Sequence, residues 1–185
     1  IQRGRGMTRK SFLTALLGGL CCHTFATMPD ILTRKKSQAN ELELIRMAVR
    51  SSFYGFAQVI LGIPLSERFH RPMIAWDDAV TEPMSLALVP RGYMKTALRV
   101  EARIAYRVIT DPSRTHLIAS SVASLAEAIA ANIRKYLTSE KLVAAFPDIL
   151  SLDPKKDGLT WSEKEFEVKR PKSGIREHTV EPVGV

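Results

Sequence analysis

A lysine–threonine pair follows a short Pro/Gly turn near the middle of the chain. Lys95 and Thr96 come directly after Pro90-Arg91-Gly92-Tyr93-Met94, and an apolar run of strand length precedes the turn. This order is typical of a phosphate-binding loop, in which backbone N–H groups point at phosphate oxygens. Lys95 would lie along the β- and γ-phosphates of ATP, and the Thr96 hydroxyl would hold Mg²⁺. Arg91 would stabilise charge on the transferred phosphoryl group. Residues 90–96 are called the phosphate loop below.

The phosphate loop departs from the usual pattern at both glycine positions. Val89 and Met94 stand where that pattern has glycine, and Gly92 lies between them. We expect the Met94 side chain to crowd the loop, because glycine permits a closer approach of phosphate. The alternative interpretation is a buried strand, a Pro-Gly turn and a helix that happens to begin with lysine.

The elements around the loop are those of a βαβ unit. Residues 85–89 predict a strand, and the spacing of apolar residues from Thr96 to Ile109 predicts a helix. A turn at residues 111–113 precedes a second predicted strand, 115–120, parallel to the first and buried. Further helices are predicted at residues 40–52, 53–61, 72–79, 124–136 and 139–146, and strands near 166–168 and from 179 onward. The sequence therefore predicts an α/β fold: a P-loop NTPase-like parallel sheet flanked by helices, incomplete at the C-terminus, with a helical N-terminal region.

Two groups of charged residues have plainer interpretations. Asp77 and Asp78 follow a short apolar stretch, and we expect an exposed helical pair rather than acids that organise a metal. Three arginines spaced four residues apart are expected on a solvated helix face; they are Arg99, Arg103 and Arg107. Neither group is therefore predicted to act in the site.

The positive charge is concentrated at the N-terminus. The net charge is +8, of which residues 1–36 carry +6 and residues 37–185 carry +2, so the body gives little support for a basic DNA groove. A basic start and a short apolar run resemble a secretory signal. We interpret residues 1–39 as an N-terminal extension, disordered or not native, and residues 40–185 as the domain. The adjacent Cys21 and Cys22 predict inert thiols, because neighbouring cysteines rarely bridge without strain.

Several segments, taken in order, resemble one family. The chain from Ser51 to Val185 is similar to the N-terminal ATPase part of the large terminase subunits of tailed bacteriophages, the motors that package DNA. The likeness lies in Phe53–Gly62, Phe69–Pro72, Leu88–Thr96, Leu117–Ser121 with Leu125–Glu127, Phe146–Asp148, Leu159–Ser162 and Thr179–Val185. Met94 departs from the family, which normally keeps glycine before the lysine.

The resemblance implies an ATPase in which Arg91 and Lys95 are catalytic and residues 90–96 bind ATP with Mg²⁺, Thr96 being the metal ligand. It implies double-stranded DNA, a portal protein and the small terminase subunit as partners, no membrane partner, and the cytoplasm of an infected bacterial host. The family's Walker B acids and nuclease domain would follow Val185. We therefore expect a truncated part that is inactive alone and poorly stable.

Two other functions remain open from the sequence. One is a different P-loop ATPase, such as a helicase-like protein. The other is a non-catalytic phage or exported protein in which Met94 has made the P-loop degenerate. Nucleotide binding separates the last of these from the two ATPases.

Overall fold

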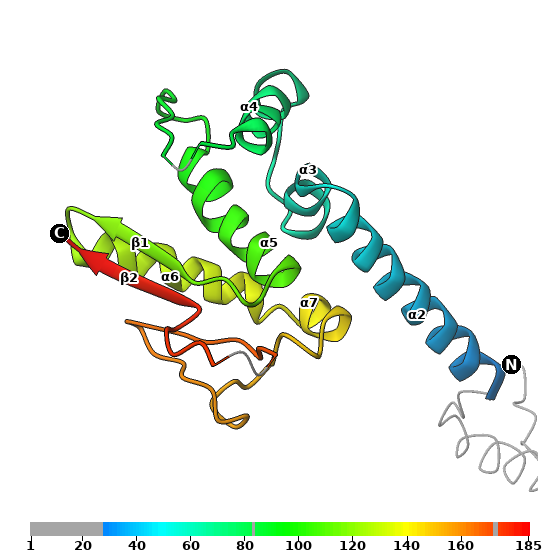
Figure 1. The fold of residues 1–185 in the computed structure, drawn as a ribbon. Helices are drawn as coiled ribbons and strands as arrows, with labels where there is room; N and C mark the ends of the chain where they lie inside the picture. The colour runs from blue at the N-terminus through cyan, green and yellow to red at the C-terminus, as the bar shows by residue number, and fades with distance from the viewer. Residues whose placement is uncertain (1–27, 83, 172–173) are drawn as a thin grey trace, which may run out of the picture. The chain divides into compact units, whose positions relative to one another are not determined.

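A computed structural model describes residues 28–82, 84–171 and 174–185 (Figure 1). The signal-like N-terminal segment, with Cys21 and Cys22, lies outside these residues. The chain divides into two compact units, residues 1–38 and 39–185. The phosphate loop belongs to the second unit, and the following description concerns that unit.

The elements are mostly helices. In chain order they are α2 (Met28–Ser51), α3 (Phe53–Gly55), η1 (Phe56–Ile60), α4 (Glu67–Ala79), η2 (Thr96–Ala102), α5 (Arg103–Thr110), β1 (His116–Ser120), α6 (Ala123–Leu137), α7 (Glu140–Ala145) and β2 (Val180–Gly184). The two η segments are π-helices; η1 directly follows α3, and η2 runs directly into α5.

The sheet of the described residues consists of two parallel strands. β1 pairs with β2 from His116 opposite Val180 to Ser120 opposite Gly184. Helix α6 follows β1 and packs against both strands, which lie side by side in Figure 1. Parallel strands need such a crossover connection, because a short hairpin would make them antiparallel. The prediction of an α/β fold is confirmed at this level: the described residues combine several helices with a small parallel sheet.

The predicted strand at residues 85–89 is absent from the described part of the chain. Leu86 and Leu88 are 81% and 87% exposed, and no described strand pairs with this segment. A strand requires a neighbour that accepts its ladder of hydrogen bonds, and here β1 is paired with β2 instead. The expectation that β1 would pair within a βαβ unit that starts at the phosphate loop is therefore wrong; the unit is β1, α6 and β2.

The helix predictions are confirmed at most positions, with shifted ends. The helix predicted at 96–109 is η2 followed by α5, and the strand predicted at 115–120 is β1. The helix predicted to begin at Pro72 begins instead at Glu67 and contains Pro72. His70 explains part of this earlier start, because its Nδ1 accepts a 2.8 Å hydrogen bond from the Ser66 backbone N–H, before the first turn.

The core lies between the sheet and the helices. Its largest fully buried side chains are Phe56, Leu98, Ile133, Leu137, Leu142 and Phe166. Tyr106 of α5 packs against both Phe53 and Phe56, with ring centroids 5.4 Å apart in each pair. This aromatic contact joins α3 and η1 to the helix that follows the phosphate loop. None of the helices in the described ranges combines the length and the apolarity needed to cross a membrane.

Gly184 is required by a close approach between β2 and the first residue of α6. A Cβ at position 184 would lie 2.8 Å from the Ala123 Cβ and 2.9 Å from its backbone N. Gly184→Ala is expected to lower the free energy of unfolding by about 1–3 kcal/mol, because packed backbone cannot move aside freely. Urea unfolding measures this change. Ala123→Gly should restore only part of the loss, since the backbone contacts remain; an unchanged midpoint in Gly184→Ala would contradict the packing.

Candidate functional site

The backbone of the phosphate loop alternates in hand just before η2. Gly92 has a φ of +88°, and Met94 has a φ of +51°, the one positive φ among the described non-glycine residues. Lys95 then returns to right-handed angles, with φ −54° and ψ −44°. Consecutive left- and right-handed residues turn their N–H groups to the same side and form a nest that binds anions. The loop thus has a backbone arrangement suited to phosphate oxygens.

The Lys95 side chain folds back across this loop. Its Nζ donates a 3.0 Å hydrogen bond to the backbone carbonyl oxygen of Val89, six residues earlier. Lys95 is exposed and forms no ion pair with any carboxylate of the described residues. The ammonium of Lys95 is therefore bound to a neutral carbonyl oxygen, and an anion could take the place of that carbonyl as its acceptor.

The helix that starts at Thr96 adds to this preference. η2 and α5 run without a break from Thr96 to Thr110, and no side chain of the described residues caps the first turn. The free N–H groups and the dipole of a helix N-terminus favour negative charge. Thr96 is exposed at this end. Its hydroxyl is one protein ligand of the kind that Mg²⁺ accepts when nucleotide phosphates and water supply the others.

Met94 contacts the hydrophobic core. Its side chain is half-buried and packs against the core residues. The cost of this residue lies in the backbone, because a left-handed φ is unfavourable by about 1 kcal/mol for a residue with a Cβ. Met94 thus adopts a positive φ, a backbone conformation that the glycine of the usual pattern would adopt without strain.

Tyr93 ties the loop to α4. Its ring packs edge-on against Phe69, with centroids 5.6 Å apart, and the Arg68 guanidinium lies 5.5 Å from the Phe69 centroid. Tyr93 and Phe69 remain 38% and 50% exposed. Arg91, the proposed transition-state cation, is exposed in the same turn. Residues 90–95 thus lie between α4 and η2, and Thr96 is the first residue of η2.

The two aspartates of α4 are not an exposed pair, and this expectation is wrong for Asp77. Its carboxylate accepts two hydrogen bonds from Arg99, at 2.8 and 2.5 Å, and its side chain is only 12% exposed. Asp78, 55% exposed, pairs with Arg103 at 2.7 Å. Arg103 itself is buried over the Phe53 ring, 3.8 Å from the centroid.

The arginine stripe is therefore not a simple solvated face. Arg99 and Arg103 join α4 to the helix after the phosphate loop, and spacing alone did not indicate which element would face them. The paired acids of the sequence were the available signal, because buried arginines need carboxylates of opposite charge. Asp77 is consequently occupied by Arg99 and is not a free base beside the loop.

A second charged cluster lies away from the phosphate loop and was missed in the sequence. His178 lies between two carboxylates, 3.2 Å from Glu165 and 3.1 Å from Glu167. The alternation of glutamates around the buried Phe166 was the signal, since residues two apart on an extended segment share a face. Within the described ranges, no group of three His, Cys, Asp or Glu side chains has the arrangement of a metal site.

His116 at the start of β1 has an unusual environment. Burial, followed by the charges of Arg107, Arg114 and Arg170, lowers the pKa of His116 to about 4. Its Nε2 is buried and has no hydrogen-bond partner among the described residues. This histidine is therefore neutral near pH 7, and the surrounding positive charge is supplied by arginines.

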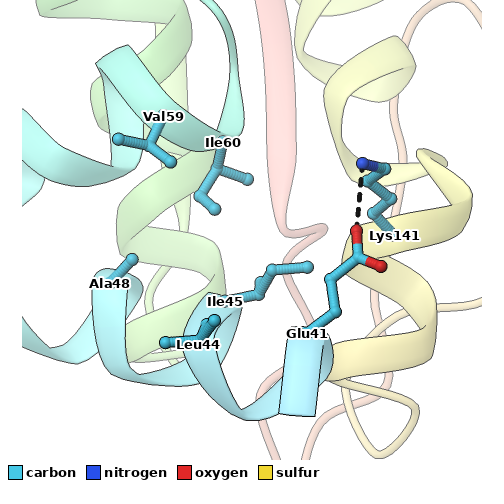
Figure 2. A pocket seen from close by; sticks show the side chains of 7 residues that line it. All are labelled: Glu41, Leu44, Ile45, Ala48, Val59, Ile60 and Lys141. Carbon is cyan, nitrogen blue, oxygen red and sulfur yellow. Dashed lines mark ion pairs between the residues drawn. The ribbon is translucent and has the colours of Figure 1, made fainter. Parts of the chain in front are cut away.

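An apolar cavity of about 240 Å³ lies between α2, η1 and α7 (Figure 2). The Lys141 ammonium and the Glu41 carboxylate form a 3.1 Å ion pair on one side of it, as the dashed line in Figure 2 marks. Aliphatic side chains form the remaining wall: Leu44, Ile45, Ala48, Val59 and Ile60. No residue of the phosphate loop lines this cavity, so it is separate from the candidate site.

Comparisons of this chain with protein-family models, with curated proteins and with solved structures found no match. The functional argument therefore depends on the loop itself and on the sequence resemblance.

Proposed function

We propose that the chain is the N-terminal, ATP-binding part of a DNA-packaging ATPase similar to the large terminase subunits of tailed bacteriophages. The observation that carries the proposal is the closed loop from Val89 to Lys95, in which the lysine spans the turn and the backbone alternates in hand. This combination supports the proposal because it brings a cation next to backbone whose N–H groups can turn toward one anion. Both are needed to hold the β- and γ-phosphates of a nucleotide.

The proposed roles of the loop residues follow from their positions. Lys95 moves from the Val89 carbonyl to the phosphates, and Thr96 supplies a hydroxyl to Mg²⁺. Arg91 is exposed in the turn, where its guanidinium can reach the γ-phosphate. Binding ATP requires these groups, whereas hydrolysis also requires a carboxylate that orients water. Asp77 is held by Arg99, so we propose that this chain binds ATP without turning it over at a useful rate.

The partners and the location belong to the same proposal. Double-stranded DNA, a portal protein, the small terminase subunit and the host cytoplasm follow from the resemblance to the packaging ATPases. A different P-loop ATPase, such as a helicase-like protein, would use the same loop in the same way. The non-catalytic alternative is favoured by one observation, the unpaired and exposed segment that precedes the loop, with Leu88 87% exposed.

Titration of the chain with a fluorescent ATP analogue, with and without Mg²⁺, tests the proposal. Saturable binding that unlabelled ATP displaces and that Mg²⁺ strengthens is the expected result. Absence of saturable binding at millimolar nucleotide would reject it in favour of the degenerate loop. Inorganic phosphate serves as the competitor that distinguishes nucleotide binding from general anion binding.

Replacing Met94 by glycine is expected to strengthen ATP binding about fivefold. Glycine adopts a positive φ without strain and removes the Cβ from the backbone that phosphate approaches. Stability should change little, because the backbone relief of about 1 kcal/mol offsets the lost packing of a half-buried methionine. The same fluorescence titration and urea unfolding measure the two effects.

Met94→Ala is the matched control for this substitution. Alanine loses the packing against the core but keeps the Cβ and the unfavourable φ. It should lower the free energy of unfolding without raising the affinity for ATP. An equal gain in affinity in both variants would mean that the Met94 backbone conformation does not limit phosphate binding.

A further inference from the structure

A polar cavity of about 410 Å³ lies between the C-terminal end of α4 and the helix formed by η2 and α5. Asp77, Arg99, Arg103 and Arg107 are among the residues that line it. No residue of the phosphate loop is part of its wall. This cavity is therefore a second candidate binding site, separate from the phosphate loop.

The arginines in this wall are not equally neutralised. Arg99 is fully engaged, since its Nε and one terminal nitrogen donate to the two oxygens of Asp77. Arg103 donates through one terminal nitrogen to Asp78, while its other terminal nitrogen is buried and lacks a hydrogen-bond partner among the described residues. That nitrogen lies 4.0 Å from Asp77 Oδ2, beyond hydrogen-bond reach. Arg103 as a whole is 8% exposed.

Arg107 is the third arginine in the wall of the cavity. No carboxylate of the described residues lies within ion-pair distance of its guanidinium. Burial, followed by repulsion from Arg103 and Arg114, lowers the pKa of Arg107. The charges of Asp77 and Asp78 act in the opposite direction and raise this pKa. Arg103 therefore has a buried N–H group without an acceptor in the described residues, and Arg107 adds an exposed guanidinium that has no carboxylate partner there.

We propose that this cavity binds a phosphate group through Arg103 and Arg107. A buried N–H without an acceptor is costly, and an anion in the cavity would supply the acceptor. Planar guanidinium groups match the oxygens of phosphate in paired hydrogen bonds, and two of them can hold its double charge. The cavity has the volume of a small-molecule site, so the group can belong to free phosphate or to a small phosphorylated compound.

Carboxylates in the wall set the limits of this site. Arg99 engages both oxygens of Asp77, but Asp77 Oδ2 also lies 4.0 Å from the free Arg103 nitrogen, so the charge of this carboxylate opposes an anion bound there. Glu82, which also lines the cavity, is exposed and forms no ion pair in the described residues. Its charge opposes an anion at the opening, so binding should be weaker than at a site lined by arginines alone.

The test is a titration of the full chain with inorganic phosphate and, separately, with ribose 5-phosphate, followed by NMR shifts of arginine side chains. Arg107→Gln should weaken binding at least tenfold. Arg114→Gln is the matched control, because it removes the same charge from a second exposed arginine, which pairs with Asp111 and does not line the cavity. It should leave the affinity within about twofold of the parent. Lys95→Ala removes only the cation of the phosphate loop, so the shifts of the Arg107 side chain on addition of phosphate should remain.

Each outcome decides between interpretations. Tighter binding of ribose 5-phosphate assigns the site to a small phosphorylated compound, and equal binding assigns it to free phosphate. An equal loss of phosphate affinity in Arg107→Gln and Arg114→Gln would mean that only the net charge of the chain matters, and it would overturn the proposed site. Loss of binding in Lys95→Ala would place the phosphate in the loop and overturn it as well, as would the absence of saturable binding. Failure of ATP to bind leaves this cavity unaffected.

Discussion

Replacing Lys95 by alanine is expected to lower the affinity for ATP by at least about 30-fold, the largest functional effect that the loop predicts. The Nζ of Lys95 is the one side-chain cation that the structure holds across the loop, through its 3.0 Å hydrogen bond to Val89. Hydrogen bonds from an ammonium to phosphate contribute more than neutral ones, and a methyl group cannot replace them. Fluorescent-nucleotide titration in the presence of Mg²⁺ measures the change.

The control is Lys155→Ala, which removes the same charge from an exposed lysine in another loop. Its affinity for ATP should match that of the parent chain. Urea unfolding should show little change in either variant, because Lys95 is exposed and its acceptor remains solvated. If Lys95→Ala binds ATP as well as the parent, this lysine is not a phosphate ligand and the proposed function is wrong.

Replacing Asp77 by asparagine is expected to be the most destabilising substitution considered, at about 3 kcal/mol. The side chains of Asp77, Arg99 and Arg103 are 12%, 22% and 10% exposed. Removing the carboxylate leaves the largely buried Arg99 without its anion, and it takes a more distant anion from Arg103, which keeps its pair with Asp78. Part of the desolvation of these cations is then no longer offset. Equilibrium unfolding in urea measures the loss, and the affinity for ATP should be retained where the variant is folded.

Asp78→Asn is the matched comparison, one residue away. Asp78 is 55% exposed, so its ion pair with Arg103 is screened by water and should contribute about 1 kcal/mol or less. Similar losses in the two variants would mean that burial does not set the strength of this cluster. A phosphate-release assay adds a second readout: turnover by the parent chain that disappears in a folded Asp77→Asn would make Asp77 catalytic and contradict its structural role.

The sequence predicted the helices better than the sheet, and particular residues explain the difference. Helical periodicity is local, so the apolar spacing from Thr96 onward located η2 and α5 without information from the rest of the chain. A strand depends on its neighbour. Leu86 and Leu88 have the composition of a buried strand, yet no described segment pairs with them. Pairing of residues 116 and 180 is a contact across more than sixty positions, which composition does not encode.

The sequence identified the residues of the candidate site but did not predict their backbone geometry or their tertiary contacts. The order of Gly92, Lys95 and Thr96 located the loop, since turn chemistry and a helix start are both local signals. The left-handed φ of Met94 could not be predicted from a methionine, because that conformation is unusual for residues with a Cβ. The partner of Arg99 was likewise hidden, because the packing of α4 against η2 is a tertiary contact.

The unpaired segment before the loop has a consequence for how tightly the loop can hold a ligand. The amides of β1 and β2 are locked in the ladder, whereas those of residues 85–89 have no backbone acceptor in the described structure and should exchange with solvent at nearly the open-chain rate. The phosphate loop is thus held by η2 on its C-terminal side, whereas the segment on its N-terminal side, residues 85–89, donates no backbone hydrogen bonds in the described structure. Part of the binding energy must then order this loose flank. A ligand that orders it would slow amide exchange at Leu86 and Leu88 before any change reaches the core.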